Sequence, residues 1–304
     1  MNLLLRTTLR SHIIGARICL PRPTVVHTAF RIPIRSFAAV PASSDSEPVV
    51  TATNRKEFLK LRFWKDVGVE ERSFTGDVAK VAGESGYVIT LDKRALKTPS
   101  GSVLAIPKQK KLVATLIAME WDNQETLLKQ HSLPMTSLAS RAIDAFGDHS
   151  TRAEVRALLL KYLETDTLCF HQSEPAVLKA LQEKHWDPLL DWTRLTYNAK
   201  LNTTTSFLLP PHPSETMQTF DKVMEKFDPW EMAAMERAVY TSKSFIVALA
   251  LVQRRVTAEQ AALASHVEVN SQIEKWGEVE DSHDVDFHDV RRQLGSVACL
   301  LATQ

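Results

Sequence analysis

The sequence predicts an α+β protein: a β-rich N-terminal domain with a covering helix, followed by an all-α helical-bundle C-terminal domain. Two observations support this prediction. Between residues 56 and 107 apolar residues alternate as they do in strands, whereas beyond residue 148 they recur at helical spacing. A length of 304 residues is typical of about two domains. We therefore place the two domains at residues 56–147 and 148–304.

The first 45 residues differ in composition from the rest of the chain. Six Arg residues precede the first acid, Asp45, and short apolar stretches separate them. Such a segment is typical of a mitochondrial transit peptide, and Arg35-Ser36-Phe37 resembles a cleavage site of the matrix protease. Residues 1–45 are therefore predicted to be a transit peptide and linker, which places the mature protein in the mitochondrial matrix.

Composition argues against two classes of function. Without the six Arg residues of the first segment, 31 of the 37 Lys and Arg residues remain against 36 acids, so the mature chain is mildly acidic. A nucleic-acid binder needs a basic surface for the phosphates. The stretch from Met232 to Val252 comes nearest to a membrane span, but charged residues interrupt it. We expect a soluble protein that binds no nucleic acid and does not insert stably into a membrane.

The predicted sheet lies in the N-terminal domain. Tyr87, Ile89 and Leu91 alternate onto one face, and Asp92-Lys93 follows them as a turn into the next strand. Residues 73–86 are expected to form a loop. The predicted strands span residues 63–67, 87–91, 94–98 and 103–106, in a small antiparallel sheet.

A helix is predicted over residues 108–129, where Leu112, Leu116 and Met119 recur on one stripe. This helix would cover the sheet. Trp121 lies at its centre, and a large aromatic side chain in such a place is typical of a core position. We predict that Trp121 is a structural residue whose replacement costs stability before function.

The C-terminal domain is predicted as successive short helices. Thr151 and Glu154 have the spacing of a capping box. Residues 199–209 are expected to form an extended connector or edge strand, and residues 290–301 the last helix. Further helix starts are predicted at Pro175, Pro188 and Pro229, the latter two with Asp187 and Asp228 as N-caps.

One helix is predicted to run from Thr257 to Trp276. Thr257 and Gln260 form a capping box at its start, and Gly277 ends it. Trp276 and Gly277 are predicted to be structural residues, the tryptophan packed into the core. The buried stripe is expected to contain Ala262, Val269, Ile273 and Trp276.

A second face of the same helix carries small or polar residues, which another chain could approach closely. It holds Ala261, Ala264, Ser265, Glu268, Ser271 and Gln272. The alternative is a solvated helix surface with Glu268 hydrogen-bonded to Gln272. Beyond Gly277 lies an acidic stretch without Lys or Arg: Glu278, Glu280, Asp281, Asp284, Asp286 and Asp289. Its alternative role is to complement the positive end of the next helix, with Asp281 or Ser282 as the cap.

No convincing active site emerges from the sequence. His283, Asp284 and His288 could serve a metal-dependent hydrolase, but no HExxH or repeated ligand pair accompanies them. Cys169 lies in an apolar run that indicates burial, and Glu164 and Asp166 are expected to be exposed. Glycine-rich phosphate loops are absent from the sequence. We therefore predict no catalytic residue, metal, cofactor or small-molecule substrate.

Several short motifs together resemble a known family. The chain is similar to the assembly chaperones of the alpha subunit of the mitochondrial F1-ATPase, known as F1-ATPase assembly factor 2. The resemblance extends from Arg62 to Leu301. It rests on residues 62–67, 91–94, 96–99, 120–124, 134–136, 166–169, 186–188, 272–277 and 283–284, in this order and spacing.

The resemblance implies a non-enzymatic chaperone of the mitochondrial matrix. Such a protein binds the unassembled alpha subunit, prevents its aggregation and promotes assembly of the F1 sector without using ATP. The resemblance further implies a functional role for Glu268 and a structural one for Trp121. We expect the partner-binding residues to be Ser265, Glu268, Gln272, Glu280 and Asp284. A general helical scaffold or adaptor protein of the matrix is the alternative.

Overall fold

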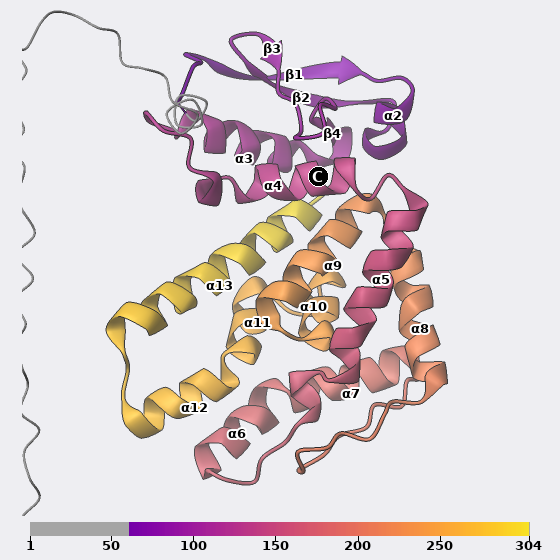
Figure 1. The fold of residues 1–304 in the computed structure, drawn as a ribbon, viewed down its shortest axis with the longest axis vertical. Coiled ribbons are helices and arrows are strands. Elements are labelled where there is room, and N and C mark those ends of the chain that lie inside the picture. The colour runs from indigo at the N-terminus through magenta and orange to yellow at the C-terminus, as the bar shows by residue number, and fades with distance from the viewer. Residues whose placement is uncertain (1–60, 304) are drawn as a thin grey trace, which may run out of the picture. The chain divides into compact units, whose positions relative to one another are not determined.

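The computed structural model describes residues 61–303, so the predicted transit peptide lies outside the described residues. A four-stranded antiparallel sheet is built around β2 (Ser85–Leu91). β1 (Val67–Ser73) pairs along the full length of β2. The short strands β3 (Arg94–Ala95) and β4 (Ala105–Pro107) pair with the two ends of β2. Figure 1 shows this sheet above the helices.

The turn between β2 and β3 explains why the first strand begins later than the sequence predicts. Asp92 and Lys93 both have positive φ, 47° and 67°, as in a two-residue type I′ hairpin. The Asp92 carboxylate accepts hydrogen bonds from the amides of Lys65 and Asp66 at 2.9 and 3.0 Å, and these bonds lower its pKa. The predicted strand at residues 63–67 is therefore wrong apart from Val67, because a side chain rather than a neighbouring strand satisfies these amides.

Two other predictions for this region need correction. The predicted loop at residues 73–86 contains a short helix, α2 (Asp77–Ala82). The strand predicted at residues 94–98 is limited to β3, after which an isolated bridge joins Lys97 to Val103.

A helix covers the sheet, as predicted. α3 (Lys111–Asp122) buries Val113, Ile117 and Trp121 against the strands, and it ends seven residues earlier than residue 129. The Trp121 ring lies in the core with its centroid 4.9 Å from that of Trp64. A large buried indole pair of this kind holds the helix to the segment that precedes β1.

α4 (Pro134–Asp144) lies between the sheet region and the remaining helices. It packs against α3 on one side and against α9 and α13 on the other. The predicted domain boundary at residue 147 falls in the turn after α4. The assignment of two domains remains a prediction.

Most of the described chain after α4 is helical, as predicted. α10 is buried at every position from Phe245 to Val252, which is typical of a helix at the centre of a bundle. None of the helices within residues 61–303 is both long and apolar enough to cross a bilayer. The helices are α5 (His149–Glu164), α6 (Ala176–His185), α7 (Asp187–Tyr197), α8 (Ser214–Glu225), α9 (Pro229–Ser242), α10 (Phe245–Val252), α11 (Ala258–Ser265), α12 (Val267–Trp276) and α13 (Glu280–Leu301).

The predicted caps are correct in part. Asp228 and Glu231 form a capping box at α9. Thr151 is not a cap: Asp148 precedes α5, and its carboxylate accepts from the Thr151 amide at 2.8 Å. Asp187 lies within the first turn of α7 instead of capping it. Residues 199–209 form a connector that bends at residues 205–208, and a bridge between Phe170 and Thr204 joins it to the segment before α6.

The helix predicted from Thr257 to Trp276 is two helices. The capping box of Thr257 and Gln260 is present, and Gly277, with φ of 89°, ends the second helix. His266 interrupts the helix with φ of −100° and ψ of 13°. The break allows α11 to pack on α13 while α12 packs on α6. The predicted buried stripe assumed one continuous helix, and the break changes which residues of the second helix face the core. The prediction that Trp276 is buried is therefore wrong, because its side chain is 71% exposed.

Candidate functional site

The expected partner-binding residues lie on three consecutive helices. Glu268 and Gln272, one turn apart on α12, are exposed, as are Glu280 and Asp284 in the first turns of α13. Ser265, at the end of α11, is half-buried, and its hydroxyl donates to the Ala261 carbonyl at 2.8 Å. We refer to the exposed part of residues 265–287 as the α12–α13 surface.

The small residues of this region do not offer a face to another chain. Ala261, Ala264 and Ser271 are buried inside the protein, which corrects the prediction. At the junction of α6 and α7, the Trp186 indole donates to the Ala264 carbonyl at 2.8 Å. α6 packs on both α11 and α12, so the protein's own helix occupies this side of them.

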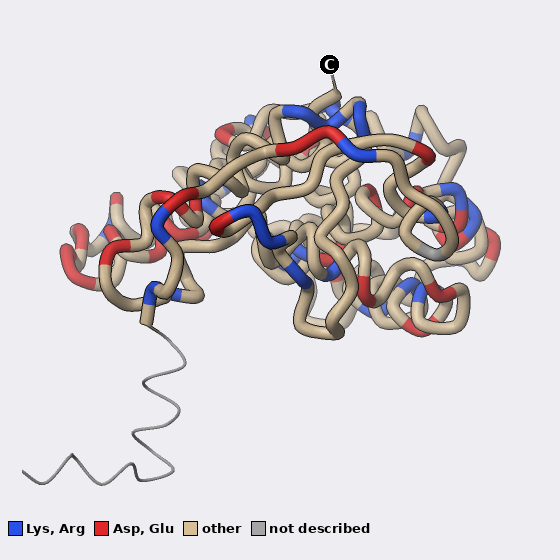
Figure 2. The backbone as a smooth tube through the Cα atoms, turned by 90° about the horizontal axis from the view of Figure 1, so that it is seen from above, with Lys and Arg blue, Asp and Glu red and all other residues tan. Residues whose placement is uncertain are grey.

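Acidic residues concentrate where α12 joins α13. In Figure 2 the acidic segments, in red, gather at the left end of the described chain, on the side where Figure 1 shows this turn. Asp286 pairs with His266, and Asp289 with Arg292. The other four acids of the stretch from residue 278 to residue 289 make no ion pair with any residue between 61 and 303. They are Glu278, Glu280, Asp281 and Asp284.

Only some of these acids stabilise the start of α13. α13 starts at Glu280, ten residues before the predicted start, and Glu280 and Asp281 lie in its first turn, where they complement the helix dipole. Neither Asp281 nor Ser282 caps it, because the N-cap is Val279. Large apolar side chains accompany the acids: Trp276, Val279 and Val285 are 71%, 59% and 68% exposed. Exposed apolar groups beside unpaired charges are typical of a protein-binding surface.

A groove borders the α12–α13 surface. It has a volume of about 770 Å³, and Val285, His288 and Arg292 of α13 form one wall while His131, Ser132 and Pro134 form the other. Glu120 and Ser132 also line an adjoining hollow of about 460 Å³, which Met119 and Leu127 make apolar. Asp284 belongs both to this groove and to the expected partner-binding residues.

The histidines of the possible metal site have other contacts. The His283 ring accepts a hydrogen bond through Nδ1 from the Val279 amide at 3.0 Å, and the His288 ring lies 5.2 Å from that of Phe287. In the described part of the chain no three His, Cys, Asp or Glu side chains come together as a metal site requires.

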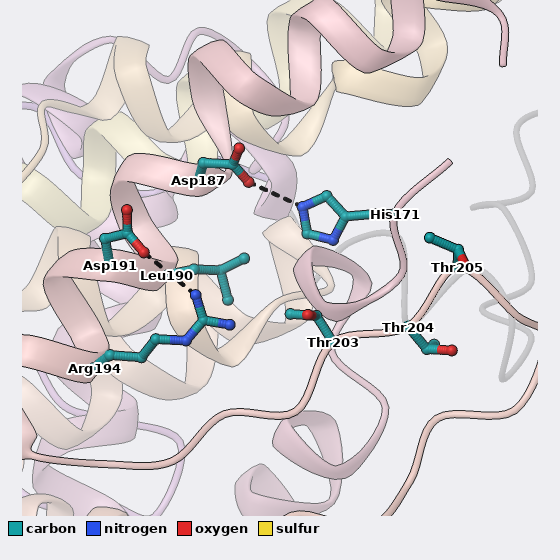
Figure 3. Close-up of a pocket in the computed structure, with 8 residues that line it drawn as sticks. All are labelled: His171, Asp187, Leu190, Asp191, Arg194, Thr203, Thr204 and Thr205. Atoms are coloured by element: carbon teal, nitrogen blue, oxygen red, sulfur yellow. Dashed lines mark hydrogen bonds and ion pairs between the residues drawn. The ribbon is translucent and has the colours of Figure 1, made fainter. Parts of the chain in front are cut away.

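A separate polar pocket was not expected from the sequence. It has a volume of about 680 Å³, and Figure 3 shows its charged groups paired with one another. His171 Nε2 lies 3.0 Å from Asp187 Oδ1, and Arg194 lies 3.3 Å from Asp191. The Trp186-Asp187-Pro188 motif, which contains Asp187, is the only feature of the sequence that points to this pocket. Because these side chains are already paired with one another, this pocket does not define a chemistry by itself.

The buried titratable groups near α10 are structural. Asp166 was expected at an exposed helix end, but it is fully buried and accepts from the Leu168 and Ile246 amides and the Ser244 hydroxyl at 2.8 to 3.0 Å. Burial raises the pKa of Asp166 to about 6. Cys169 is buried, as predicted, and burial raises the pKa of its thiol as well. A thiol of this kind is a poor nucleophile.

The described residues define an α+β protein with an exposed acidic and apolar surface, the features of a protein that binds other proteins. The chain belongs to the ATP12 chaperone family. The family model, ATP12 chaperone protein, matches residues 61–194. Mitochondrial protein atp12 of Schizosaccharomyces pombe is 34% identical over 252 residues, covering 79% of this chain and 81% of that protein. Mitochondrial protein ATP12 of Saccharomyces cerevisiae is 29% identical over 288 residues, covering 82% and 86%.

Solved structures agree with this assignment. Atp12 from Paracoccus denitrificans has a TM-score of 0.65 and 26% identity, and the match covers 81% of this chain and 97% of that one. The Atu1473 protein of Agrobacterium tumefaciens has a TM-score of 0.68 at 26% identity, covering 85% and 91%. The arrangement of a small sheet and a helical C-terminal part is therefore shared with a solved Atp12 protein.

Proposed function

We propose that this chain is a non-enzymatic assembly chaperone of the mitochondrial matrix. It binds the unassembled alpha subunit of the F1-ATPase, prevents its aggregation and promotes assembly of the F1 sector of ATP synthase. Membership of the ATP12 chaperone family and two relatives named as mitochondrial support this proposal. The Arg-rich, acid-free first segment is consistent with import.

The α12–α13 surface is the observation that carries the proposal. A subunit that has not met its partner exposes an apolar interface, and holding it requires a complementary surface. The α12–α13 surface offers exposed Trp276, Val279 and Val285 for apolar contact. Its unpaired acids attract basic groups of the client and speed encounter. Binding of this kind needs neither a cofactor nor a catalytic residue.

The proposed contact residues are Ser265, Glu268, Gln272, Glu280 and Asp284. Glu268 and Gln272 share one face of α12, so they contact the same part of a client. Reversing the charge of Glu268 changes that face without removing any hydrogen bond or ion pair formed within residues 61–303. Glu268 lies in the first turn of α12, where an acid complements the helix dipole, so the stability of a charge-reversed variant has to be measured beside its binding.

The test is a co-purification of the mature chain, from about residue 46, with isolated alpha subunit. Glu268→Lys is compared with wild type and with Glu274→Lys, a matched control with the same change of charge on another face of α12. We expect wild type and the control to keep the alpha subunit soluble. Glu268→Lys should fail to do so, although thermal melts show that it is folded at the temperature of the assay. If wild type does not bind the alpha subunit, or binds several assembled complexes equally well, the chaperone proposal is wrong and a general scaffold or adaptor role replaces it.

A further inference from the structure

Two polar side-chain contacts join α11 to α13. At the start of α11, Glu259 accepts two hydrogen bonds from the Arg291 guanidinium, at 2.8 and 2.9 Å. At the end of α11, His266 Nε2 lies 2.9 Å from Asp286 Oδ2. The residue numbers rise along one helix as they fall along the other, so the two helices are antiparallel.

The far end of α13 is held by other cations. The buried Lys110 ammonium donates to the Leu300 carbonyl at 2.8 Å, and the Arg254 guanidinium donates to the Leu301 carbonyl. Positive groups at these last carbonyls also complement the helix dipole. α13 is therefore anchored at its C-terminal end and through its middle, while its first turns extend beyond the contact with His266.

His266 occupies a junction of three helices. It separates α11 from α12, it is buried, and its side chain reaches Asp286 on α13, which is partly exposed. The His266–Asp286 contact closes the base of the segment 267–285. That segment contains α12, the turn at Gly277 and the first turns of α13, and with them all the proposed contact residues except Ser265.

The α12–α13 surface depends on the relative placement of two helices. α12 lies on α6, whereas α13 lies on α9 and α11, so few contacts join α12 directly to α13. The His266–Asp286 hydrogen bond is the side-chain contact that joins the start of α12 to α13. A binding surface that is held in place before the client arrives avoids the entropy cost of ordering it on binding.

We propose that His266 is a positioning residue for client binding: its contact with Asp286 fixes the start of α12 relative to α13 and so sets the spacing of the proposed contact residues. This inference rests on the proposed function of the α12–α13 surface. His266 itself does not touch the client. It acts through Glu268 and Gln272 on one side and Glu280 and Asp284 on the other.

The first measurement is hydrogen exchange on the mature chain without client. Asp286→Ala removes the contact from its exposed side and leaves no core cavity. We expect amides of residues 267–285 to exchange about tenfold faster in this variant, with those of α9 and α10 unchanged. Glu259→Ala removes the other α11–α13 contact, which is farther from the segment, and should leave these amides as in wild type. Unchanged exchange in Asp286→Ala overturns the inference.

The second measurement is retention of the alpha subunit by the same variants. Asp286→Ala and His266→Ala should release it at least about fivefold faster than Glu259→Ala does, at matched melting temperatures. His266→Gln, which keeps an N–H donor near Asp286, should restore retention. If all three alanine variants retain the subunit equally, His266 has only a structural role. If wild type fails to bind the subunit, the proposed function fails, and the exchange result still decides whether the contact holds the segment.

Discussion

The Thr136 hydroxyl donates a hydrogen bond to the Glu120 carboxylate over 2.7 Å and thereby joins α4 to α3. The same carboxylate accepts the amides of Met135 and Thr136 at 2.6 and 2.9 Å. Leu133, the N-cap of α4, has no side chain that could do this. A glutamate from the preceding helix thus caps α4, and desolvation raises its pKa despite these bonds.

Thr136→Val should destabilise the protein although it conserves shape. The Thr136 hydroxyl also accepts from Trp121 Nε1 at 3.0 Å, so the substitution leaves a buried indole N–H without a partner. We expect the free energy of unfolding to fall by about 1–3 kcal/mol. Urea unfolding measures it, with Thr115→Val on the exposed face of α3 as the control. Equal stability of Thr136→Val and wild type would show that this contact contributes nothing.

Gly86→Ala should disrupt the sheet. A Cβ at Gly86 would overlap the backbone carbonyl oxygen of Ile106 in β4. β4 would have to move away from β2, at a cost of about 1–3 kcal/mol or more. Gly295→Ala, in the interior of α13, is the matched control. A Cβ at this position has no neighbouring atom within 4 Å, and alanine favours the helix over glycine, so the stability should stay equal or rise. Thermal melts that rank the two variants in the opposite order would contradict this packing.

Local patterns in the sequence were sufficient for β2, for the helix that covers the sheet and for the caps at Asp228 and Thr257. These features depend on residues within one or two turns of each other. The start of β1 was missed because it depends on Asp92, 27 residues from Lys65. No local pattern signals that a distant carboxylate satisfies two backbone amides.

The candidate site shows the same limit. The exposure of Glu268 and Gln272 follows from their own helix. The break at His266 does not, because its partner lies 20 residues away on α13. Burial of Asp166 was missed for the same reason, since the Ser244 hydroxyl and the Ile246 amide that stabilise it lie 78 and 80 residues further along the chain. Both errors concern polar groups whose partners are brought by tertiary packing.

Asp166→Asn should change the pH dependence of stability. Burial raises the pKa of folded Asp166 from 3.8 to about 6, so the folded state retains a proton that the unfolded state has lost. The unfolding free energy of wild type therefore falls as pH rises between these values, by about 3 kcal/mol from this group. Asparagine cannot titrate, so the variant should lack this fall.

Urea unfolding from pH 4 to pH 7 measures the difference between the two proteins. Asp166→Asn should be less stable at pH 4, because one carboxylate oxygen becomes an NH2 group that faces the donors from which that oxygen accepted. This deficit should shrink by about 3 kcal/mol towards pH 7, because only wild type loses stability as pH rises. The informative quantity is therefore the slope of the unfolding free energy against pH. A variant with the wild-type slope would show that another group is responsible.

Trp276→Ser should leave stability unchanged and weaken client binding. The side chain is 71% exposed at the end of α12, so its loss should change the unfolding free energy by no more than about 0.5 kcal/mol. On the proposed α12–α13 surface a large aromatic residue is a typical binding anchor, and its removal should cost about 1–2 kcal/mol of affinity for the alpha subunit. Leu195→Ser on α7, 84% exposed, is the control for general apolar exposure and should affect neither property. Titration of the alpha subunit with wild type and the two variants measures the affinity. Equal affinity of Trp276→Ser and wild type would show that this tryptophan does not bind the client. A large fall in the melting temperature would show that it belongs to the core.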